Sequence, residues 1–200
     1  MSSNKSKADA VYSYTSSKLT YIQSVIDTGS GRGLLAELRR GAGKKPGELP
    51  ELWGVIFDRI PEELEGKNDV SYSEWAVYTA LTLYALHCQG SDRDMNIRDF
   101  SVGKAAAGLV ETNDDIGRVT NRLEPVVTAV SPDDLAYHMR GFIQLLKSKD
   151  IPLDYAALAK DLYLFNKSDK ADSVKLRWGR DFYREINHKF KKEKGADNNG

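Results

Sequence analysis

The chain has 200 residues, of which 40% are hydrophobic and 29% are charged, and its formal net charge is zero. This composition is typical of one soluble globular domain, so any attraction to nucleic acid must come from local clusters of charge. The one cysteine, Cys88, excludes an internal disulfide framework and fits a reducing compartment. The polar N-terminus does not resemble a signal peptide, and no apolar run approaches the ~20 residues that span a bilayer. We therefore expect a cytoplasmic protein without a membrane partner.

The two ends of the chain carry no clear hydrophobic period. Residues 1–16 are rich in Ser, Lys and Tyr, and we expect them to form a flexible tail. Residues 191–200 are charged and then rich in Asn and Gly, so we expect them to be disordered. Between these tails, residues 17–190 are expected to form a single α-helical domain.

A basic loop follows two helical segments near the start of this domain. Apolar residues recur at helical spacing in residues 17–27 and, after a break at Gly29-Ser30-Gly31, in residues 33–40. Residues 39–47 (RRGAGKKPG) then combine four cations with glycine and proline, which favour a sharp turn. Such a loop offers positive charge and backbone N–H groups to an anion. A solvated basic turn between two helices is the equally simple interpretation.

The next segments predict the centre of the core. Pro50 can begin a helix in which Leu52, Trp53 and Ile56 have helical spacing. Farther along, Ser71 and Glu74 have the spacing of a capping box, and residues 75–86 are apolar nearly all round. A helix without a polar face must be surrounded by other elements, so we expect this one to be central.

The rest of the chain adds further helices around it. They are expected near residues 101–110, 114–130, 131–147, 155–165 and 174–190. Small residues in the first of these allow close approach to another helix, and no alternating strand pattern is present. The sequence therefore predicts an all-α helical bundle built around a buried central helix.

The sequence offers no pattern that carries enzyme chemistry. Gly41-Ala42-Gly43-Lys44 is not a P-loop, because Leu38 stands where that motif needs glycine and Lys45 where it needs Ser or Thr. The three histidines are far apart and lack metal-ligand spacing: His87, His138 and His188. We therefore expect no catalytic residue, no cofactor and no metal site.

Three basic clusters stand out against the neutral total charge. The first surrounds the basic loop and consists of Arg32, Arg39, Arg40, Lys44 and Lys45. The second contains Arg118 and Arg122 on one helix face, and Arg140 and Lys147 of the next helix can join it. The third spans residues 170–194 and includes Arg177 and Arg180. Such clusters can track a phosphate backbone, and because most aromatic residues have core-like positions we expect no stacking platform for bases.

The same basic residues can instead pair within the protein. Arg180 and Arg184, for example, alternate with Asp181 and Glu185. The clusters could also pair with acidic surfaces of partner proteins. The alternative to a nucleic-acid-binding subunit is therefore a helical protein–protein adaptor without direct nucleic-acid contact.

Six motifs follow one another along the chain in a characteristic order. They are residues 39–53, residues 74–87, residues 101–105, the pair Arg118 and Arg122, residues 153–162 and residues 177–183. Together they resemble the CasB small subunit of the type I-E CRISPR Cascade surveillance complex, over roughly residues 30–185. Asn121 and Leu123 depart from the pattern, because the arginine-bearing helix of that family usually carries a further basic residue beside Arg122.

The resemblance implies a non-catalytic, all-helical subunit that acts in antiviral defence. Two copies of CasB lie against the CasC subunits that hold the guide RNA, so the expected protein partners are CasC, a second copy of this chain, CasA, CasD and CasE. The basic surface of CasB helps to stabilise the target strand and the displaced strand of the R-loop. CRISPR RNA and target DNA are therefore the expected nucleic-acid partners. The candidate contact residues are Arg32, Arg39, Arg40, Lys44, Lys45, Arg118, Arg122, Arg140, Lys147, Arg177 and Arg180.

Overall fold

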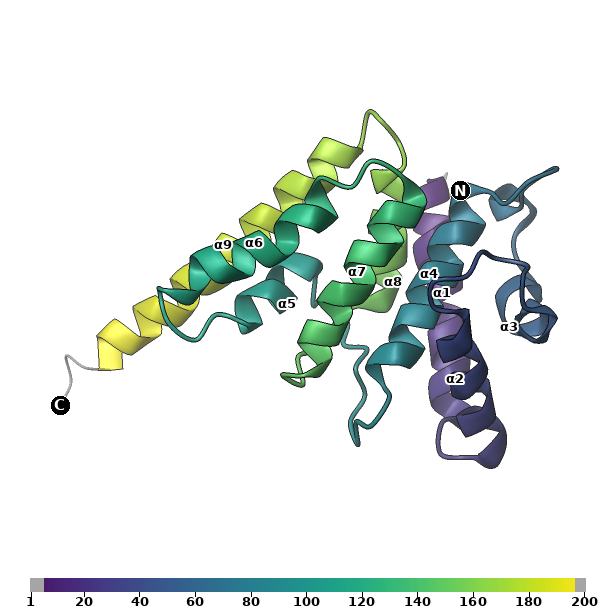
Figure 1. Cartoon of the computed structure of the whole chain (residues 1–200), viewed down its shortest axis with the longest axis horizontal. Helices are drawn as coiled ribbons and strands as arrows, with labels where there is room; N and C mark the ends of the chain where they lie inside the picture. The colour runs from purple at the N-terminus through teal and green to yellow at the C-terminus, as the bar shows by residue number, and fades with distance from the viewer. Residues whose placement is uncertain (1–5, 197–200) are drawn as a thin grey trace, which may run out of the picture.

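The computed structural model describes the backbone of residues 6–196 and the side chains of residues 6–191, and over this span it contains helices and loops but no β-strand (Figure 1). The α-helices are α1 (Lys7–Val25), α2 (Gly29–Gly41), α3 (Trp53–Phe57), α4 (Tyr72–His87), α5 (Val102–Gly108), α6 (Asp115–Val127), α7 (Pro132–Lys147), α8 (Tyr155–Phe165) and α9 (Ala171–Ala196). Within the described span, no helix is both long and apolar enough to cross a bilayer. The predicted all-α fold is confirmed.

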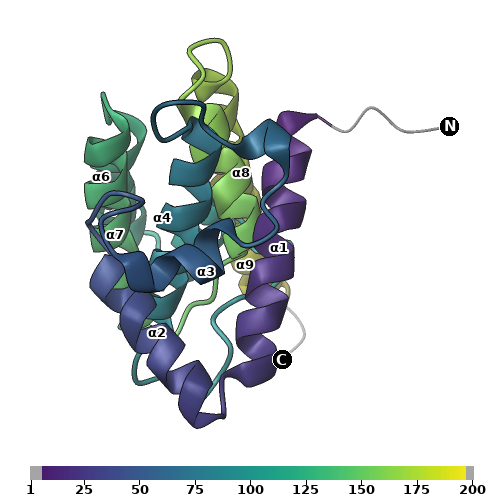
Figure 2. The same cartoon turned by 90° about the vertical axis from the view of Figure 1, so that its right-hand side faces the viewer.

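Helix α4 is the buried centre of the bundle. The Ser71 hydroxyl accepts a hydrogen bond from the Glu74 N–H at 3.0 Å, and the Glu74 carboxylate accepts one from the Ser71 N–H at 2.7 Å. This reciprocal capping box begins the helix as predicted. Every residue from Ser73 to Ala85 is buried, because α1, α2, α7 and α8 all pack against α4 (Figures 1 and 2). The predicted central helix is therefore confirmed.

Helices α5, α6 and α9 form the part of the molecule farthest from α1 to α3 (Figure 1). Helix α9 packs along α5, and α6 contacts both α5 and α7. The close approach of α5 and α9 depends on Gly103, where an added Cβ atom would lie 2.1 Å from the carbonyl oxygen of Trp178. Glycine is the residue that fits this position without a shift of α9.

The N-terminal boundary differs from the prediction. Helix α1 begins at Lys7, so the flexible tail predicted for residues 1–16 is wrong for residues 7–16, and residues 1–5 lie outside the described residues. The helical period is weak here because the buried side of α1 includes small and polar side chains, such as Ala8 and Thr15. Contacts with α8 stabilise this first part of the helix. One of them joins Lys160 Nζ to the Asp9 carboxylate at 2.6 Å.

Two further boundaries are also corrected. Gly29-Ser30-Gly31 begins α2 and does not break a helix, because the Thr28 hydroxyl caps it by accepting from the Gly31 N–H at 3.0 Å. At the other end, α9 continues to Ala196, so the disordered tail predicted for residues 191–200 is wrong for residues 191–196. Lys and Glu, which are good helix formers, dominate that segment. Residues 197–200 lie outside the described residues.

Candidate nucleic-acid interface

The basic loop between α2 and α3 is held in place by two aromatic side chains. Gly43 and Gly47 adopt left-handed backbone conformations with φ of 90° and 93°. The Trp53 indole N–H donates to the carbonyl oxygen of Gly47 at 3.2 Å, and the Tyr78 hydroxyl donates to that of Gly41 at 2.9 Å. Burial is the main cause that raises the pKa of Tyr78 to about 12, so this hydroxyl remains a donor. The loop follows a helix and not a strand, which is not the arrangement of a P-loop.

Trp53 does not belong to the core, although its spacing with Leu52 and Ile56 suggested that it would. Leu52 and Ile56 are both buried, whereas Trp53 is 52% exposed. Its indole N–H needs an acceptor and finds one on the loop at Gly47, so the ring covers the loop from outside. Trp53 is therefore a surface contact of the basic loop.

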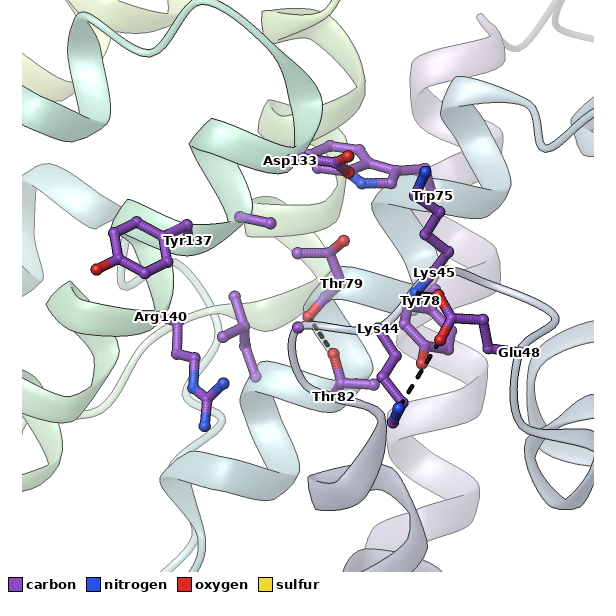
Figure 3. A pocket seen from close by; sticks show the side chains of 13 residues that line it. Lys44, Lys45, Glu48, Trp75, Tyr78, Thr79, Thr82, Asp133, Tyr137 and Arg140 are labelled. Atoms are coloured by element: carbon purple, nitrogen blue, oxygen red, sulfur yellow. Dashed lines mark hydrogen bonds and ion pairs between the residues drawn. The ribbon is translucent and has the colours of Figure 1, made fainter.

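Loop and helix residues together line a cavity of about 380 Å³, which we call the loop cavity (Figure 3). Lys44 and Lys45 come from the loop, and Arg140 comes from α7. The Arg140 guanidinium donates to the carbonyl oxygen of Ala42 at 3.2 Å, which joins α7 to the loop. Glu48 also lines this cavity, and its carboxylate lies 3.8 Å from Lys44 Nζ. The loop cavity is therefore only weakly positive.

A second cavity of about 410 Å³ lies between α6 and α7, and we call it the α6–α7 groove. It shares Tyr137 and Arg140 with the loop cavity, so the two adjoin. The described residues that line it include no Asp or Glu: Asn121, Arg122, Pro125, Tyr137, His138, Arg140, Gly141 and Gln144. Arg122 forms no ion pair within the described part of the chain. Its charge is therefore available to an external anion.

Tyr137 is an exception to the expectation that most aromatic residues have core-like positions. Tyr137 is 74% exposed and makes an edge-on contact with the ring of His138, with 5.3 Å between ring centroids. Figure 3 shows Tyr137 and Arg140 on the same side of α7, with the Tyr137 ring directed away from Trp75. An aromatic ring thus stands at the boundary between the loop cavity and the α6–α7 groove.

Three other candidates are engaged by groups of the protein itself. Arg118 lies 2.6 Å from the Asp115 carboxylate. That carboxylate also accepts from the Thr112 N–H at 2.8 Å, which is the main cause that lowers the pKa of Asp115 and keeps it charged beside Arg118. Arg40 lies 3.4 Å from the Glu51 carboxylate, and Lys147 Nζ donates to the Gln89 side chain at 3.3 Å.

Arg32 and Arg39 face a different part of the surface. They line a cavity of about 720 Å³ between the α1–α2 corner and the loop after α4. This lining also contains Asp27, Asp92 and Asp94, so it is not a basic surface. The cluster that looked continuous in the sequence is therefore divided, because Lys44 and Lys45 lie at the loop cavity and these two arginines do not.

Arg177 is part of the framework of the protein. Its guanidinium donates to the carboxylate of Asp161, a buried residue of α8, and the Trp178 indole N–H donates to the same carboxylate at 2.6 Å. The cavity of about 480 Å³ beside Arg177 shares no lining residue with the α6–α7 groove. Arg180, which is exposed, makes no ion pair within the described residues. The cavity beside Arg177 is therefore separate from the α6–α7 groove.

Comparison with known proteins decides the family. The family model for CRISPR-associated protein Cse2 matches residues 34–183. The chain belongs to the Cse2 family. A crystal structure of CasB from Thermobifida fusca is 32% identical in sequence, with a TM-score of 0.74 over 86% of this chain and 97% of that one. The predicted resemblance to CasB is confirmed.

More distant structures share the Cse2 fold. The crystal structure of CasB from M. ruber is 21% identical, with a TM-score of 0.66, and covers 87% of this chain and 97% of its own. A chain of a CRISPR RNA-guided surveillance complex is 17% identical, with a TM-score of 0.71, and covers 92% of this chain and 99% of its own. The comparison with curated proteins gave no match.

The sequence identified only Arg122 and Arg140 of the groove in this Cse2 protein as contact residues. The lining residues that it did not identify include Asn121, Tyr137 and Gln144. A signal for Tyr137 was present, because the buried positions of α7 include Leu135 and Met139, and a residue midway between them points outward. No comparable signal marks Asn121 and Gln144, because only the contact between α6 and α7 brings them to one groove.

Proposed function

We propose that this Cse2 protein is a non-catalytic subunit of a type I-E Cascade surveillance complex and holds nucleic-acid backbone on its basic surface. The binding surface consists of the loop cavity and the α6–α7 groove, with Lys44, Lys45, Arg122 and Arg140 as its cations. The family membership supports the place in the complex, as does the fold shared with a chain of a CRISPR RNA-guided surveillance complex. In antiviral defence, this surface stabilises the target strand and the displaced strand of the R-loop.

The observation that carries the proposal is the absence of Asp and Glu from the described lining of the α6–α7 groove. Arginine binds phosphate through paired N–H groups, and it does so best where no carboxylate competes for them. Arg122 meets this condition, and Arg140 uses a guanidinium N–H to reach the Ala42 carbonyl oxygen without forming an ion pair in the described chain. The two side chains are therefore placed to bind neighbouring phosphates.

The ionisable groups near the end of α4 support a non-catalytic role. Burial raises the pKa of the Cys88 thiol to about 11, so the thiol is protonated and weakly nucleophilic at neutral pH. Burial lowers the pKa of His87 to about 4, and its Nδ1 atom lies 2.7 Å from the Tyr155 hydroxyl. Neither residue lines the loop cavity or the groove.

The remaining surface provides contacts for other subunits. Leu176 and Tyr183 are each about half exposed and lie seven residues apart on α9, so they share one side of that helix. Exposed tyrosine beside an aliphatic residue is typical of protein interfaces. We propose CasC, CasA, CasD, CasE and a second copy of this chain as partners, in the cytoplasm.

The test is a double substitution in the assembled complex. Arg122→Ala/Arg140→Ala should shorten the lifetime of the R-loop and reduce the salt slope of target binding by about two, because two phosphate contacts are lost. Arg32→Ala/Arg39→Ala is the matched control, since it removes the same charge from a cavity that also contains three aspartates. If the first variant binds target with wild-type affinity and salt slope, the adaptor without nucleic-acid contact is the better description.

A further inference from the structure

The α6–α7 groove combines features that plain backbone binding does not require. Tyr137 is 74% exposed and lines the groove together with Arg122 and Arg140. Isolated exposed aromatic residues are common and need no explanation. Tyr137 differs because it stands among cations and amides in a cavity whose described lining has no carboxylate. Its ring is therefore accessible to a flat, uncharged group that belongs to a negatively charged ligand.

The chemistry of the lining identifies the class of this ligand. Nucleotides carry a flat base beside a phosphate, and base stacking on an aromatic side chain is tolerant of sequence. Asn121 and Gln144 present amides that can both donate and accept, so they can pair with the edge of any base. In a duplex the faces of the bases are covered by their neighbours, and a base must leave the stack to reach a protein ring.

We infer that the α6–α7 groove binds an unpaired strand of nucleic acid, with one base stacked on Tyr137 and adjacent phosphates held by Arg122 and Arg140. The inference rests on the proposed function and deepens it, because it adds a base contact on the Tyr137 ring to the proposed contacts with phosphates. It also revises the expectation that the aromatic residues leave no stacking platform. The groove volume of about 410 Å³ accommodates one base and its sugar, not a duplex.

The experiment uses the full chain and fluorescently labelled oligothymidine of about 12 nucleotides, with binding followed by anisotropy at low salt. Tyr137→Leu should weaken binding about 5- to 100-fold, whereas Tyr137→Phe should bind like the wild type because it keeps the ring. The salt slope should be the same for all three proteins, because no charge is removed. On an oligonucleotide of the same length without bases, the three proteins should bind equally.

Each result separates the inference from the proposed function. Wild-type affinity of Tyr137→Leu for oligothymidine overturns the stacking contact, and if Arg122→Ala/Arg140→Ala is weakened in the same assay the proposed function still stands. Both fail if the double-arginine variant also binds like the wild type, or if the wild type binds no single strand. The inference is also overturned if the strand without bases binds as tightly as oligothymidine. It fails too if Tyr137→Leu weakens binding of labelled polyglutamate equally, which would indicate an acidic protein segment as the ligand.

Discussion

The α6–α7 groove and the surface around α9 are both rich in arginine, but they use it differently. Arg122 in the groove makes no ion pair within the described residues. On α9, Arg177 binds the buried carboxylate of Asp161, and Arg184 lies 3.1 Å from Asp181. Asp181 in turn accepts from the Ser101 hydroxyl at 2.7 Å, which connects α9 to the start of α5. Arg177 thus joins α9 to α8, whereas Arg122 in the groove remains available.

The difference shows that the availability of a basic side chain depends on which carboxylates the fold brings to it. Arg177 and Asp161 are sixteen positions apart in sequence and lie on different helices. Arg122 belongs to a helix that also contains Asp115 and Glu124, yet neither acid lines the groove. A count of charge along the chain therefore overestimates the basic surface near α9. The predictions below test whether α9 is framework and the groove is binding surface.

The largest effect is expected at the α5–α9 contact. Gly103→Ala should destabilise the protein by about 3 kcal/mol or more, because the added Cβ atom would lie 2.1 Å from a backbone oxygen that side-chain rotation cannot move. Urea denaturation measures the change. Gly179→Ala in α9 is the control: its Cβ atom meets nothing within 4 Å, so it should stabilise the helix by about 0.5–1 kcal/mol. Equal effects at the two glycines would contradict the close approach.

The second prediction concerns His87, a buried residue at the end of α4 that does not line the groove. The pKa of His87 is lowered from 6.5 to about 4, chiefly by burial, so between these values the unfolded chain binds more protons than the folded one. The contribution of His87 to stability should therefore be constant above about pH 6.5 and fall by on the order of 3 kcal/mol as the pH drops to 4. Denaturation at several pH values, with His87→Gln for comparison, measures this. If the free energy of unfolding depends on pH in the same way in both proteins, His87 does not cause that dependence.

Third, Arg177→Ala should lower the free energy of unfolding by about 2–3 kcal/mol, because it leaves the Asp161 carboxylate buried with only Trp178 as donor. The value is below that of a fully buried pair because the Arg177 side chain is 43% exposed. Arg180→Ala, three residues along the same helix, should change stability by less than about 0.5 kcal/mol. Calorimetry or urea denaturation distinguishes the two. If both variants lose less than about 0.5 kcal/mol of stability, Arg177 does not stabilise the fold, and the contrast between α9 and the groove does not hold.

The smallest effect tests the pair at the start of α6. Asp115→Asn should release Arg118 and tighten target binding by a few fold, with a steeper salt dependence, because one more cation becomes available. The asparagine oxygen can still accept from the Thr112 N–H, so the local fold is preserved. The double variant Asp115→Asn/Arg118→Ala should lose the gain. Unchanged affinity in Asp115→Asn would place Arg118 away from the strand.

The sequence predicted the fold well where one residue pattern determined it. The nearly continuous apolar run of α4, its Ser71–Glu74 capping box and the small residues of α5 all had the roles expected. Helix α1 was missed over residues 7–16 because its stability comes from contacts with α8, such as the bond from Lys160 to Asp9. Helix propensity and hydrophobic periodicity are properties of one segment, so they give no information about the distant residues that the segment contacts.

The candidate site was predicted in part, for a related reason. Arg140 lines the same groove as Arg122, as the adjacent helices predicted, but Arg118 and Lys147 do not line it. The pairing of Arg40 with Glu51 and of Arg177 with Asp161 depends on how the chain folds back, so both arginines were predicted as available cations. The sequence also could not separate Arg39 from Lys44, which face different cavities.

The fluorescence of Trp53 can report on whether the basic loop is covered by a ligand. Trp75 and Trp178 are 8% and 2% exposed, whereas the Trp53 indole lies at the surface against Gly47. A water-soluble quencher of fluorescence should therefore reach Trp53 well before it reaches the other two. A strand that covers the loop should shield Trp53 from the quencher and leave the emission of Trp178 unchanged, because Trp178 lines neither the loop cavity nor the groove. Occupancy can therefore be followed without a label on either partner.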